Sequence, residues 1–272
     1  MARGSCPAAS LSPGPNQMTR ALFATLLFAA TPLVAAAQQP AAKPEDTEVW
    51  TPVPAIVTPG ATSSSAPSDA IKLFDGRGLT EWVKAGTATA AGWTVKNGIL
   101  TVNKAAGDIE TKRKFRNYQL HLEWREPVGL RDSGQARGNS GIFLATVGST
   151  GYELQILDSY RNKTYVNGQA GSIYKQSPPL ANAMRKPGEW QVYDVVWTAP
   201  TFTADGWMST PGRVTAFHNG VLVQNNYEVK GTTEYIGPPT VVAHGASAIR
   251  LQAHGDPSPP ISFRNIWVRE LP

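Results

Sequence analysis

The residues Glu153, Gln155 and Asp158 stand in a segment whose spacing suits acid/base chemistry. Residues 151–158 read Gly-Tyr-Glu-Leu-Gln-Ile-Leu-Asp, so apolar and polar side chains alternate. Because successive side chains of a β-strand point to opposite faces, we expect one apolar row and a polar row holding Glu153 and Gln155. A carboxylate on a rigid strand can serve as a general acid or base, or it can simply face water.

Asp158 ends the same segment and is a second candidate catalytic carboxylate. Strict alternation places it on the face opposite Glu153, so it can join a shared site only through a bulge or at the strand end. The alternative is a structural one, in which Asp158 caps the turn into Ser159 and Tyr160.

Two further polar rows carry candidates. In residues 118–125, Glu123 and Arg125 belong to the polar row and would line the same cleft as Glu153 if both strands share a sheet. A cross-strand ladder of Glu and Arg is the alternative. Near the C-terminus, Gln252 and His254 alternate with apolar residues, and a histidine at a strand end can titrate near neutral pH or hold the following turn.

The elements that must position these side chains are short strands. Asn97-Gly98 and Asn219-Gly220 each separate two alternating runs, which predicts two-residue β-hairpins. Residues 178–186 begin with Pro-Pro and are expected to form a loop, and Trp207 is the tryptophan expected to be exposed. Further strands are expected at residues 118–125, 141–146, 152–157, 191–198, 248–253 and 261–270. This pattern predicts an all-β, antiparallel two-sheet sandwich of the jelly-roll type.

The N-terminal quarter reads as export and tether sequence. Arg20 precedes an apolar run that ends in small residues, so residues 1–37 are expected to be a leader with a signal peptide. Residues 38–68 are rich in Pro, Ala, Thr and Ser and predict a linker. The folded domain is expected over residues 69–272, without a stable membrane span once the signal is removed.

Composition and motifs exclude several functions. The formal charge is +5 for the whole chain, and the basic residues are not clustered densely, so nucleic-acid binding is not expected. The one cysteine, Cys6, lies in the leader, which excludes thiolate chemistry in the mature domain. No cofactor motif is visible. The four histidines are scattered, so metal binding is unassigned, although a divalent ion held by acids and histidine across strands is left open.

A series of short phrases in a fixed order is similar to the 3-keto-disaccharide hydrolase family over residues 71–271. The phrases are Leu73-Phe74-Asp75-Gly76, Asn97-Gly98, Asn139-Ser140-Gly141-Ile142-Phe143, residues 152–158, Gly171-Ser172-Ile173-Tyr174, Gly188-Glu189-Trp190, Asn219-Gly220-Val221 and Leu251-Gln252-Ala253-His254-Gly255. The resemblance implies a concanavalin A-like jelly roll that is periplasmic or secreted. It also implies action on glycosides whose glucose unit is oxidised at C3.

This resemblance implies a chemistry with one central base. The ketone acidifies the hydrogen at C2, so a base can form an enolate and the C1 substituent can leave. We expect Glu153 as the base and His254 as the acid at the leaving group, with Asp158 as a third catalytic candidate. The expected substrate-binding residues are Glu123, Arg125, Asn139, Ser140, Gln155, Tyr174, Lys175 and Gln252.

Three interpretations follow from the same residues. The first is an exported enzyme that hydrolyses or eliminates 3-keto-glucosides and works with a sugar 3-oxidoreductase. The second is a non-catalytic, lectin-like carbohydrate-binding module. The third is a conventional β-glucanase, because Glu153, Gln155 and Asp158 parallel the Glu-x-Asp-x-x-Glu strand of laminarinases. The amide at Gln155 disfavours this third reading, since it removes a carboxylate that a retaining mechanism uses.

Overall fold

The computed structural model describes residues 41–272, and the expected leader lies outside them. The chain divides into two compact units, one ending at Pro54 and one spanning Ala55–Pro272. The described part of the first unit carries a single 3₁₀ turn, η1 (Pro44–Thr47), with exposed side chains. The second unit holds all the strands found in the described residues, and the functional argument concerns this unit alone.

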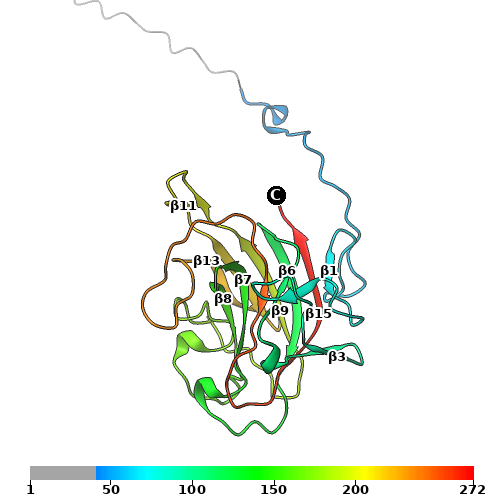
Figure 1. Ribbon diagram of the computed structural model, residues 1–272. Helices are drawn as coiled ribbons and strands as arrows, with labels where there is room; N and C mark the ends of the chain where they lie inside the picture. Colours follow the sequence, from blue (N-terminus) through cyan, green and yellow to red (C-terminus); the bar gives the residue numbers. More distant parts are fainter. Residues whose placement is uncertain (1–40) are drawn as a thin grey trace, which may run out of the picture. The chain divides into compact units, whose positions relative to one another are not determined.

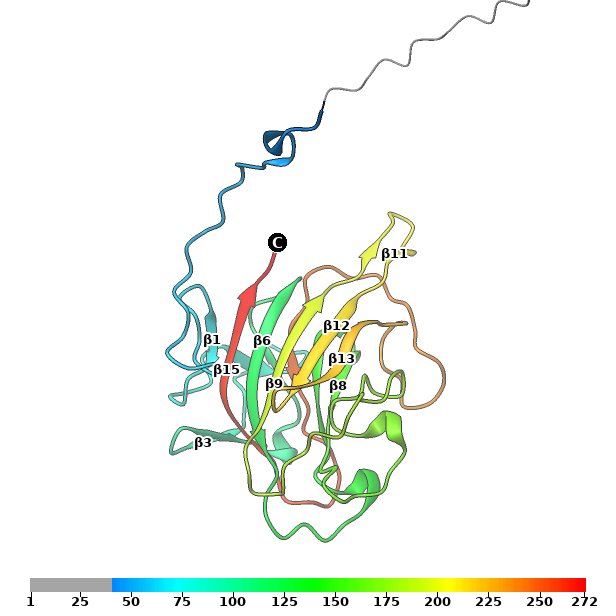
Figure 2. The ribbon, with the colours of Figure 1, turned by 180° about the vertical axis from the view of Figure 1, so that it is seen from behind.

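The larger of two main sheets has eight strands, and every pairing within it is antiparallel. Figures 1 and 2 show its central strands β9, β6 and β15 side by side. In spatial order the strands are β13 (Val221–Glu228), β12 (Arg213–His218), β9 (Gln191–Thr198), β6 (Tyr118–Arg125), β15 (Ser262–Glu270), β4 (Ile99–Thr101) and β3 (Thr94–Lys96), with β1 (Ile71–Phe74) also paired to β15.

The smaller sheet has five strands and is also antiparallel. Its spatial order is β2 (Trp82–Lys84), β5 (Ile109–Thr111), β14 (Arg250–Leu251), β7 (Ser140–Val147) and β8 (Thr150–Ile156). A separate hairpin joins β10 (Thr201–Phe202) to β11 (Met208–Thr210), and three 3₁₀ turns lie in the connections, namely η2 (Lys104–Ala106), η3 (Gly134–Ala136) and η4 (Val166–Gly168).

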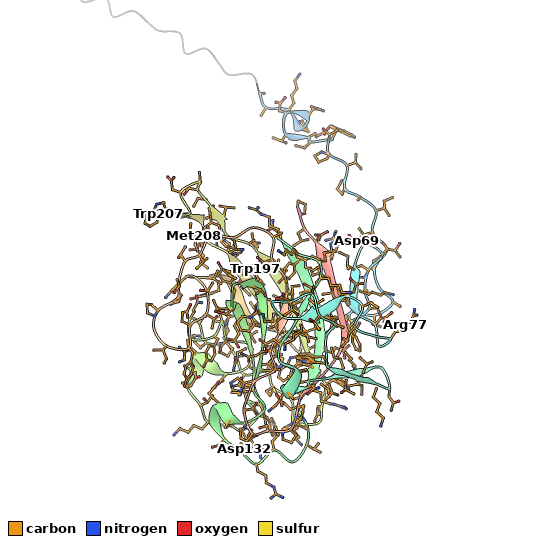
Figure 3. All side chains as sticks on the ribbon, viewed as in Figure 1. Asp69, Arg77, Asp132, Trp197, Trp207 and Met208 are labelled. Atoms are coloured by element: carbon orange, nitrogen blue, oxygen red, sulfur yellow. The ribbon has the colours of Figure 1, made fainter. Side chains whose placement is uncertain are left out.

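The two sheets pack face to face through their apolar rows. The ring of Tyr152 on β8 lies 5.1 Å from the ring of Trp197 on β9, and both side chains are fully buried. The Tyr193 hydroxyl on β9 donates to the carbonyl of Gln155 on β8 at 2.8 Å. These contacts fix one sheet against the other, because buried hydroxyls need a partner and aromatic pairs add to area burial. Figure 3 shows Trp197 within the sandwich and Trp207 on the outlying β10–β11 hairpin, where it is 75% exposed.

The predicted fold class is confirmed, and so are both hairpins. Asn97, Gly98, Asn219 and Gly220 have φ angles of 53°, 75°, 53° and 81°, as a type I′ turn requires. Residues 178–186 form a loop as expected. The strand expected at 248–253 is shorter, because only Arg250–Leu251 keeps the ladder. Short strands such as β2 and β5 were not expected, since three residues give almost no alternation to detect.

Part of the expected linker belongs to the compact unit. The carbonyl of Ser64 accepts hydrogen bonds from the Asn265 side chain at 2.8 Å and from the Trp267 indole at 3.1 Å. Both donors lie on β15 in the larger sheet. The segment from Ala55 to Ser68 therefore includes residues that pack against the sandwich, even though its Pro/Ser-rich composition is typical of a tether.

An ionic cluster occupies the outer face of the larger sheet beneath this segment. Arg264 and Asn265 donate to the carboxylate of Glu123 at 2.6 and 2.9 Å. His121, which has no exposed surface, bonds Asp194 at 2.6 Å and stacks on Trp267. Burial alone would raise the pKa of Glu123, but the hydrogen bonds from its neighbours lower it to about 2.

We predict that Glu123→Gln destabilises the protein in a pH-dependent way. The lowered pKa of Glu123, about 2, means that its contribution to stability is complete above its ordinary pKa and is lost as the pH falls through 2. Replacing a carboxylate that accepts charged hydrogen bonds should cost about 1.5–3 kcal/mol at pH 7. Denaturant unfolding at several pH values measures this.

The matched control is Glu270→Gln, because Glu270 forms an ion pair with Arg113 on the surface, where both side chains are about half exposed. That change should cost no more than about 1 kcal/mol. The interpretation of Glu123 is contradicted if its variant loses stability equally at pH 7 and near pH 2.

Candidate functional site

The polar face of β8 is covered, unlike that of a strand that simply meets water. Glu153 and Gln155 are 5% and 1% exposed, although they point away from the core between the sheets. A loop hydrogen bond accounts for part of the cover, since the backbone N–H of Glu153 donates to the Thr233 hydroxyl at 3.1 Å. Tyr174 from a second loop also borders the same space. The outer face of the smaller sheet thus forms the floor of a pocket.

This pocket has a volume of about 310 Å³ and unites six of the expected site residues. They come from the residue before β7, from β8, from the segment after β14 and from one loop, and they are Asn139, Glu153, Gln155, Tyr174, Gln252 and His254. Sequence reasoning missed the other half of the lining, which consists of Phe143, Ser149, Thr150, Thr233, Glu234 and Tyr235. The segment 231–245 has no periodicity, so its approach to β8 had no sequence signal.

Glu153 is a buried carboxylate without a cation. Among the described residues no Lys, Arg or His forms an ion pair with it. Burial raises its pKa to about 8, and the negative charge of Asp108 adds to this effect. A carboxyl group with a pKa near the working pH is suited to both receiving and returning a proton.

Gly141 makes room for this carboxylate. Its partner in the β7–β8 register is Gln155, and a Cβ atom there would lie 2.3 Å from Oε1 of the nearby Glu153. Any other residue would therefore displace the carboxylate or the strand. The glycine in the Asn139-Ser140-Gly141 phrase is explained by this close approach.

Two amide side chains present acceptors without donors. Gln155 donates through Nε2 to Asn139 Oδ1 at 3.1 Å, while its Oε1 is buried and has no partner within the described part of the chain. Gln252 Oε1 is also buried and has no hydrogen-bond partner in the described residues. Buried acceptors of this kind cost free energy unless a donor reaches them. Since both residues line the pocket, a ligand rich in hydroxyl groups would satisfy them.

His254 is held by the residue two positions later. The backbone N–H of Asp256 donates to His254 Nδ1 at 3.1 Å, and Asp256 Oδ1 lies 3.3 Å from the same nitrogen. Because Nδ1 accepts that bond, the neutral ring carries its proton on Nε2. Protonated His254 would instead pair with the Asp256 carboxylate.

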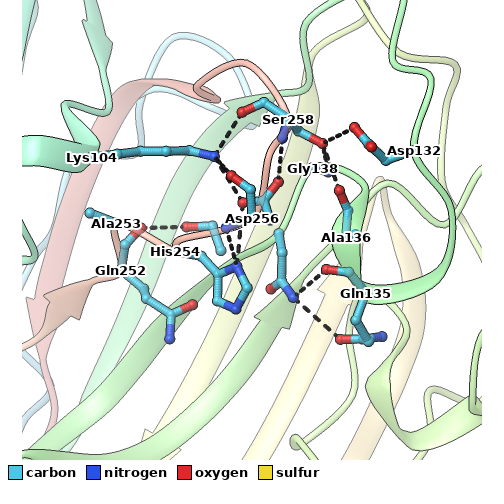
Figure 4. A network of polar contacts seen from close by, with 12 residues as sticks. Lys104, Asp132, Gln135, Ala136, Gly138, Gln252, Ala253, His254, Asp256 and Ser258 are labelled. Carbon is cyan, nitrogen blue, oxygen red and sulfur yellow. Dashed lines mark hydrogen bonds and ion pairs between the residues drawn. The ribbon is translucent and has the colours of Figure 1, made fainter.

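Lys104 and Ser258 fix Asp256 in turn (Figure 4). The Lys104 ammonium lies 3.0 Å from Asp256 Oδ1, and the Ser258 backbone N–H donates to Oδ2 at 3.1 Å. Burial alone would raise the pKa of Asp256, but hydrogen bonds from His254 and Lys104 lower it. The carboxylate beside His254 is therefore ionised under all ordinary conditions.

Tyr174 and Tyr235 line one side of the pocket, and Tyr165 and Lys175 contact them from outside it. The hydroxyl of Tyr174 lies 2.6 Å from that of Tyr165, and burial raises the pKa of Tyr174, which keeps its phenol protonated. Lys175 was expected to bind substrate, but it does not line the pocket. Its ammonium donates to the carbonyl of Tyr235 and lies 4.3 Å from that ring's centre, so Lys175 holds the loop that carries Tyr235.

Asp158 and Ser140 lie outside the pocket lining, and both have structural contacts. Asp158 is completely buried, pairs with Arg137 at 2.6 Å and accepts from the Tyr160 backbone N–H at 3.0 Å. This is the turn-capping arrangement that was the alternative to a catalytic role. Ser140 donates to the carbonyl of Gln252 at 2.8 Å and so supports a pocket residue without entering the pocket itself.

The expectation that Glu123 and Arg125 share a cleft with Glu153 is wrong. Both lie on β6 in the larger sheet, whereas Glu153 lies on β8 in the smaller one. The polar rows of these strands face away from the common core, so the sandwich separates them. Arg125 stacks on Trp190, with its guanidinium carbon 4.6 Å from the ring centre.

Residues 41–272 contain no cluster of three or more His, Cys, Asp or Glu side chains arranged to hold a metal ion. In the same residues, no helix is long and apolar enough to cross a membrane.

The protein is an antiparallel β-sandwich with a polar pocket on the outer face of its smaller sheet. The family model described as a 3-keto-alpha-glucoside-1,2-lyase-like domain matches residues 69–269. The chain belongs to this family, which confirms the resemblance read from the sequence.

Relatives agree with this assignment. A 3-keto-disaccharide hydrolase of Bacteroides thetaiotaomicron is 26% identical over 151 residues, which is 44% of this chain and 49% of that protein. The chain thus matches about half the length of this curated relative. A crystal structure from Parabacteroides distasonis, named a "putative glycosyl hydrolase", is 56% identical with a TM-score of 0.79, covering 84% of this chain and 97% of that one. A second such structure, at 19% identity and a TM-score of 0.55, supports the fold alone.

We predict that Glu153→Gln stabilises the protein in a pH-dependent way. Because the folded-state pKa of Glu153 is raised to about 8, its protonated form favours folding below its ordinary pKa, and that benefit is lost as the pH rises through 8. The amide carries no charge, so the variant should melt several degrees above the wild type at pH 9 and close to it at pH 4. Thermal unfolding by circular dichroism measures both.

The control for this measurement is Glu234→Gln, which changes a carboxylate on the pocket rim that is only half-buried. A Glu153→Gln variant with the same melting temperature difference at pH 4 and pH 9 would show that Glu153 is not protonated by burial.

We also predict that Gly141→Ala disables the site while the fold persists. The new methyl group would occupy the space 2.3 Å from Glu153 Oε1, so the carboxylate must rotate away. We expect at least about a hundredfold loss of turnover, as a misplaced catalytic group produces, with a loss of stability of about 1–3 kcal/mol. Gly245→Ala, where a Cβ meets no atom within 4 Å, is the matched control. Unchanged turnover in Gly141→Ala would contradict the role of this glycine.

Proposed function

We propose that the protein cleaves glycosides of 3-keto-glucose by removing the proton at C2. The observation that carries this proposal is a buried carboxylate in the pocket, Glu153, that has no cation partner among the described residues and a pKa near 8. A conventional glycosidase needs two carboxylates on either side of the bond. A ketone at C3 removes that need, because it makes the C2 hydrogen acidic enough for one base.

The proposed reaction has three steps. Glu153 takes the C2 proton, the electron pair of the C2–H bond moves toward the C3 ketone, and an enolate forms. The enolate electrons then form the C1–C2 double bond as the C1–O bond breaks, and the leaving group departs with a proton from an acid. Water then adds to C1 and gives its proton to the acid that protonated the leaving group, while Glu153 returns a proton to C2, which yields the free 3-keto sugar and restores the enzyme.

Glu153 can take up the C2 proton because its environment lets both protonation states exist near pH 8. Its covered position keeps bulk water from the carboxylate. The nearby negative charge of Asp108 further favours the protonated product of this step. At lower pH a growing fraction of Glu153 is already protonated, so the rate of C2 proton removal should rise toward pH 8.

His254 is the proposed acid at the leaving group. The acid is its protonated form, in which Nδ1–H would pair with the Asp256 carboxylate 3.3 Å away and Nε2–H would give its proton to the leaving oxygen, which returns the ring to its neutral state. This pairing lets His254 gain and lose a proton without leaving its position. The restraint of Asp256 by Lys104 therefore serves the orientation of the imidazole.

The remaining pocket residues orient the sugar and stabilise its enolate. Gln155 and Gln252 have free acceptors for hydroxyl groups within the described structure, and Asn139 holds the Gln155 amide. The Tyr174 phenol stays protonated and can donate to the oxygen that gains charge at C3. A donor placed where charge develops is worth about 10²–10³ in rate.

The test is turnover of a 3-keto-disaccharide compared with its unoxidised parent in D₂O. We expect monosaccharide release from the keto sugar only, with deuterium incorporated at C2, because the proton is exchanged at the base. Glu153→Gln should lower turnover by at least about 10⁴-fold, and His254→Ala by about 10²–10⁴-fold. Glu123→Gln serves as the carboxylate-to-amide control, because Glu123 lies on the other sheet.

Three outcomes would reject parts of the proposal. Binding of the keto sugar without turnover would identify a lectin-like module. Equal turnover of the unoxidised parent would indicate a conventional glycosidase. Turnover without deuterium at C2 would exclude proton removal at that carbon and favour direct hydrolysis.

The chemistry requires a partner reaction. A 3-keto sugar must be supplied by oxidation of the C3 hydroxyl of a glycoside, so we propose a functional link to a sugar 3-oxidoreductase. We also propose that the leader directs export to the periplasm or the medium, where glycosides are met. N-terminal sequencing of the protein recovered from cell fractions, with cleavage before Gln38, would support this.

A further inference from the structure

A second polar hollow lies beside the Glu153 pocket and belongs to the same sheet. It has a volume of about 430 Å³ and is lined by Lys84, Ala85, Gly86, Asp108, Gly148, Ser149 and Arg250. These residues come from β2, the segment before β5, β14 and the turn between β7 and β8. Ser149 lines both spaces, so the two hollows adjoin. Together they cross the smaller sheet from β8 toward β2.

Arg250 forms the partition between the two spaces. It is 5% exposed and donates to the carbonyls of Ser149 and Gly148 at 2.9 and 3.0 Å. Its guanidinium carbon lies 5.5 Å from the ring centre of Phe143, which lines the first pocket. Its Nε atom is buried and has no acceptor among the described residues. A nearly buried arginine with an unused donor marks the second hollow as a place for an oxygen-rich ligand.

The other polar groups of this hollow also retain hydrogen-bonding capacity. Lys84, Ser149 and Asp108 line the hollow and bring an ammonium, a hydroxyl and a carboxylate, and Asp108 Oδ1 accepts from the Ala253 backbone N–H at 2.8 Å. The side chains thus offer both donors and acceptors. This mixture matches hydroxyl groups, each of which can donate and accept.

The balance of charges in the hollow narrows the class of ligand that it can bind. Lys84 and Arg250 carry positive charge, and they are matched by Asp108 in the hollow and by Glu110, whose carboxylate lies 3.7 Å from Arg250. An acidic sugar would meet two carboxylates as well as two cations and would gain little. A neutral sugar can use the three charged groups that line the hollow through its hydroxyls.

We propose that this second hollow is the subsite for the leaving group and that it takes a neutral sugar unit. This inference rests on the proposed function, which puts the 3-keto unit over Glu153. The bond that breaks then lies between the two spaces, near Ser149 and above Arg250. The enzyme would therefore prefer 3-keto-disaccharides over 3-keto-glucosides with a small substituent at C1.

The experiment compares two probes, a 3-keto-disaccharide and methyl 3-keto-glucoside. The variants are Lys84→Ala, which removes an exposed donor on β2, and Ala85→Trp, which fills the second hollow without touching the first. The matched control is Lys96→Ala, since Lys96 is an exposed strand lysine on the other sheet. We measure kcat/KM for both probes, and their affinity by calorimetry in the Glu153→Gln background.

We expect Lys84→Ala to lower kcat/KM for the disaccharide about threefold to tenfold, as one hydrogen bond is worth. Ala85→Trp should lower it by at least about tenfold, and neither change should affect the methyl glucoside. Equal effects on both probes, or none on the disaccharide, would overturn the subsite. If the wild type cleaves neither probe, the proposed function fails, and the affinities still decide the subsite, because only the disaccharide should bind more weakly to the two variants.

Discussion

The structure around the pocket depends on keeping one carboxylate away from water without giving it a cation. Glu153 has this environment because its strand belongs to a sheet whose outer face is covered by loops. The cost of burying the charged form appears as a pKa near 8, which is the property that a proton-transferring group requires. Each neighbouring feature can be understood from this constraint, from the absence of a side chain at Gly141 to the negative charge of Asp108 nearby.

The sandwich makes such an environment rigid. Tyr152 and Leu154, on either side of Glu153, are fully buried between the sheets, and Tyr193 of the opposite sheet bonds the carbonyl of Gln155. The strand is therefore fixed through its apolar row, which leaves its polar row free for function. A catalytic group on a strand held in this way needs few contacts of its own.

The sequence predicted what is periodic or local. Alternation placed Glu153 and Gln155 on one face, and Asn-Gly pairs identified both hairpins. It could not say which sheet each strand joins, because pairing over long separations leaves no trace in one strand's pattern. For this reason Glu123 was assigned to the wrong face of the molecule. The lining from Thr233 to Tyr235 was missed because irregular loops have no periodicity. Asp158 follows the end of β8 and pairs with Arg137, so it belongs to the turn that was the alternative to a catalytic role.

Glu123 and Glu153 show how the same residue type serves two purposes in one sandwich. Both are nearly buried on an outward-facing row, yet the pKa of Glu123 falls to about 2 and that of Glu153 rises to about 8. The difference comes from their partners, because Arg264 and Asn265 compensate the charge of Glu123 while Glu153 has no such donors in the described chain. The larger sheet thus uses the carboxylate of Glu123 to hold together β6, β15 and the segment from Ala55 to Ser68. The smaller sheet leaves the charge of Glu153 uncompensated. The free-energy cost of burying that charge is relieved only when a ligand or a proton reaches the pocket.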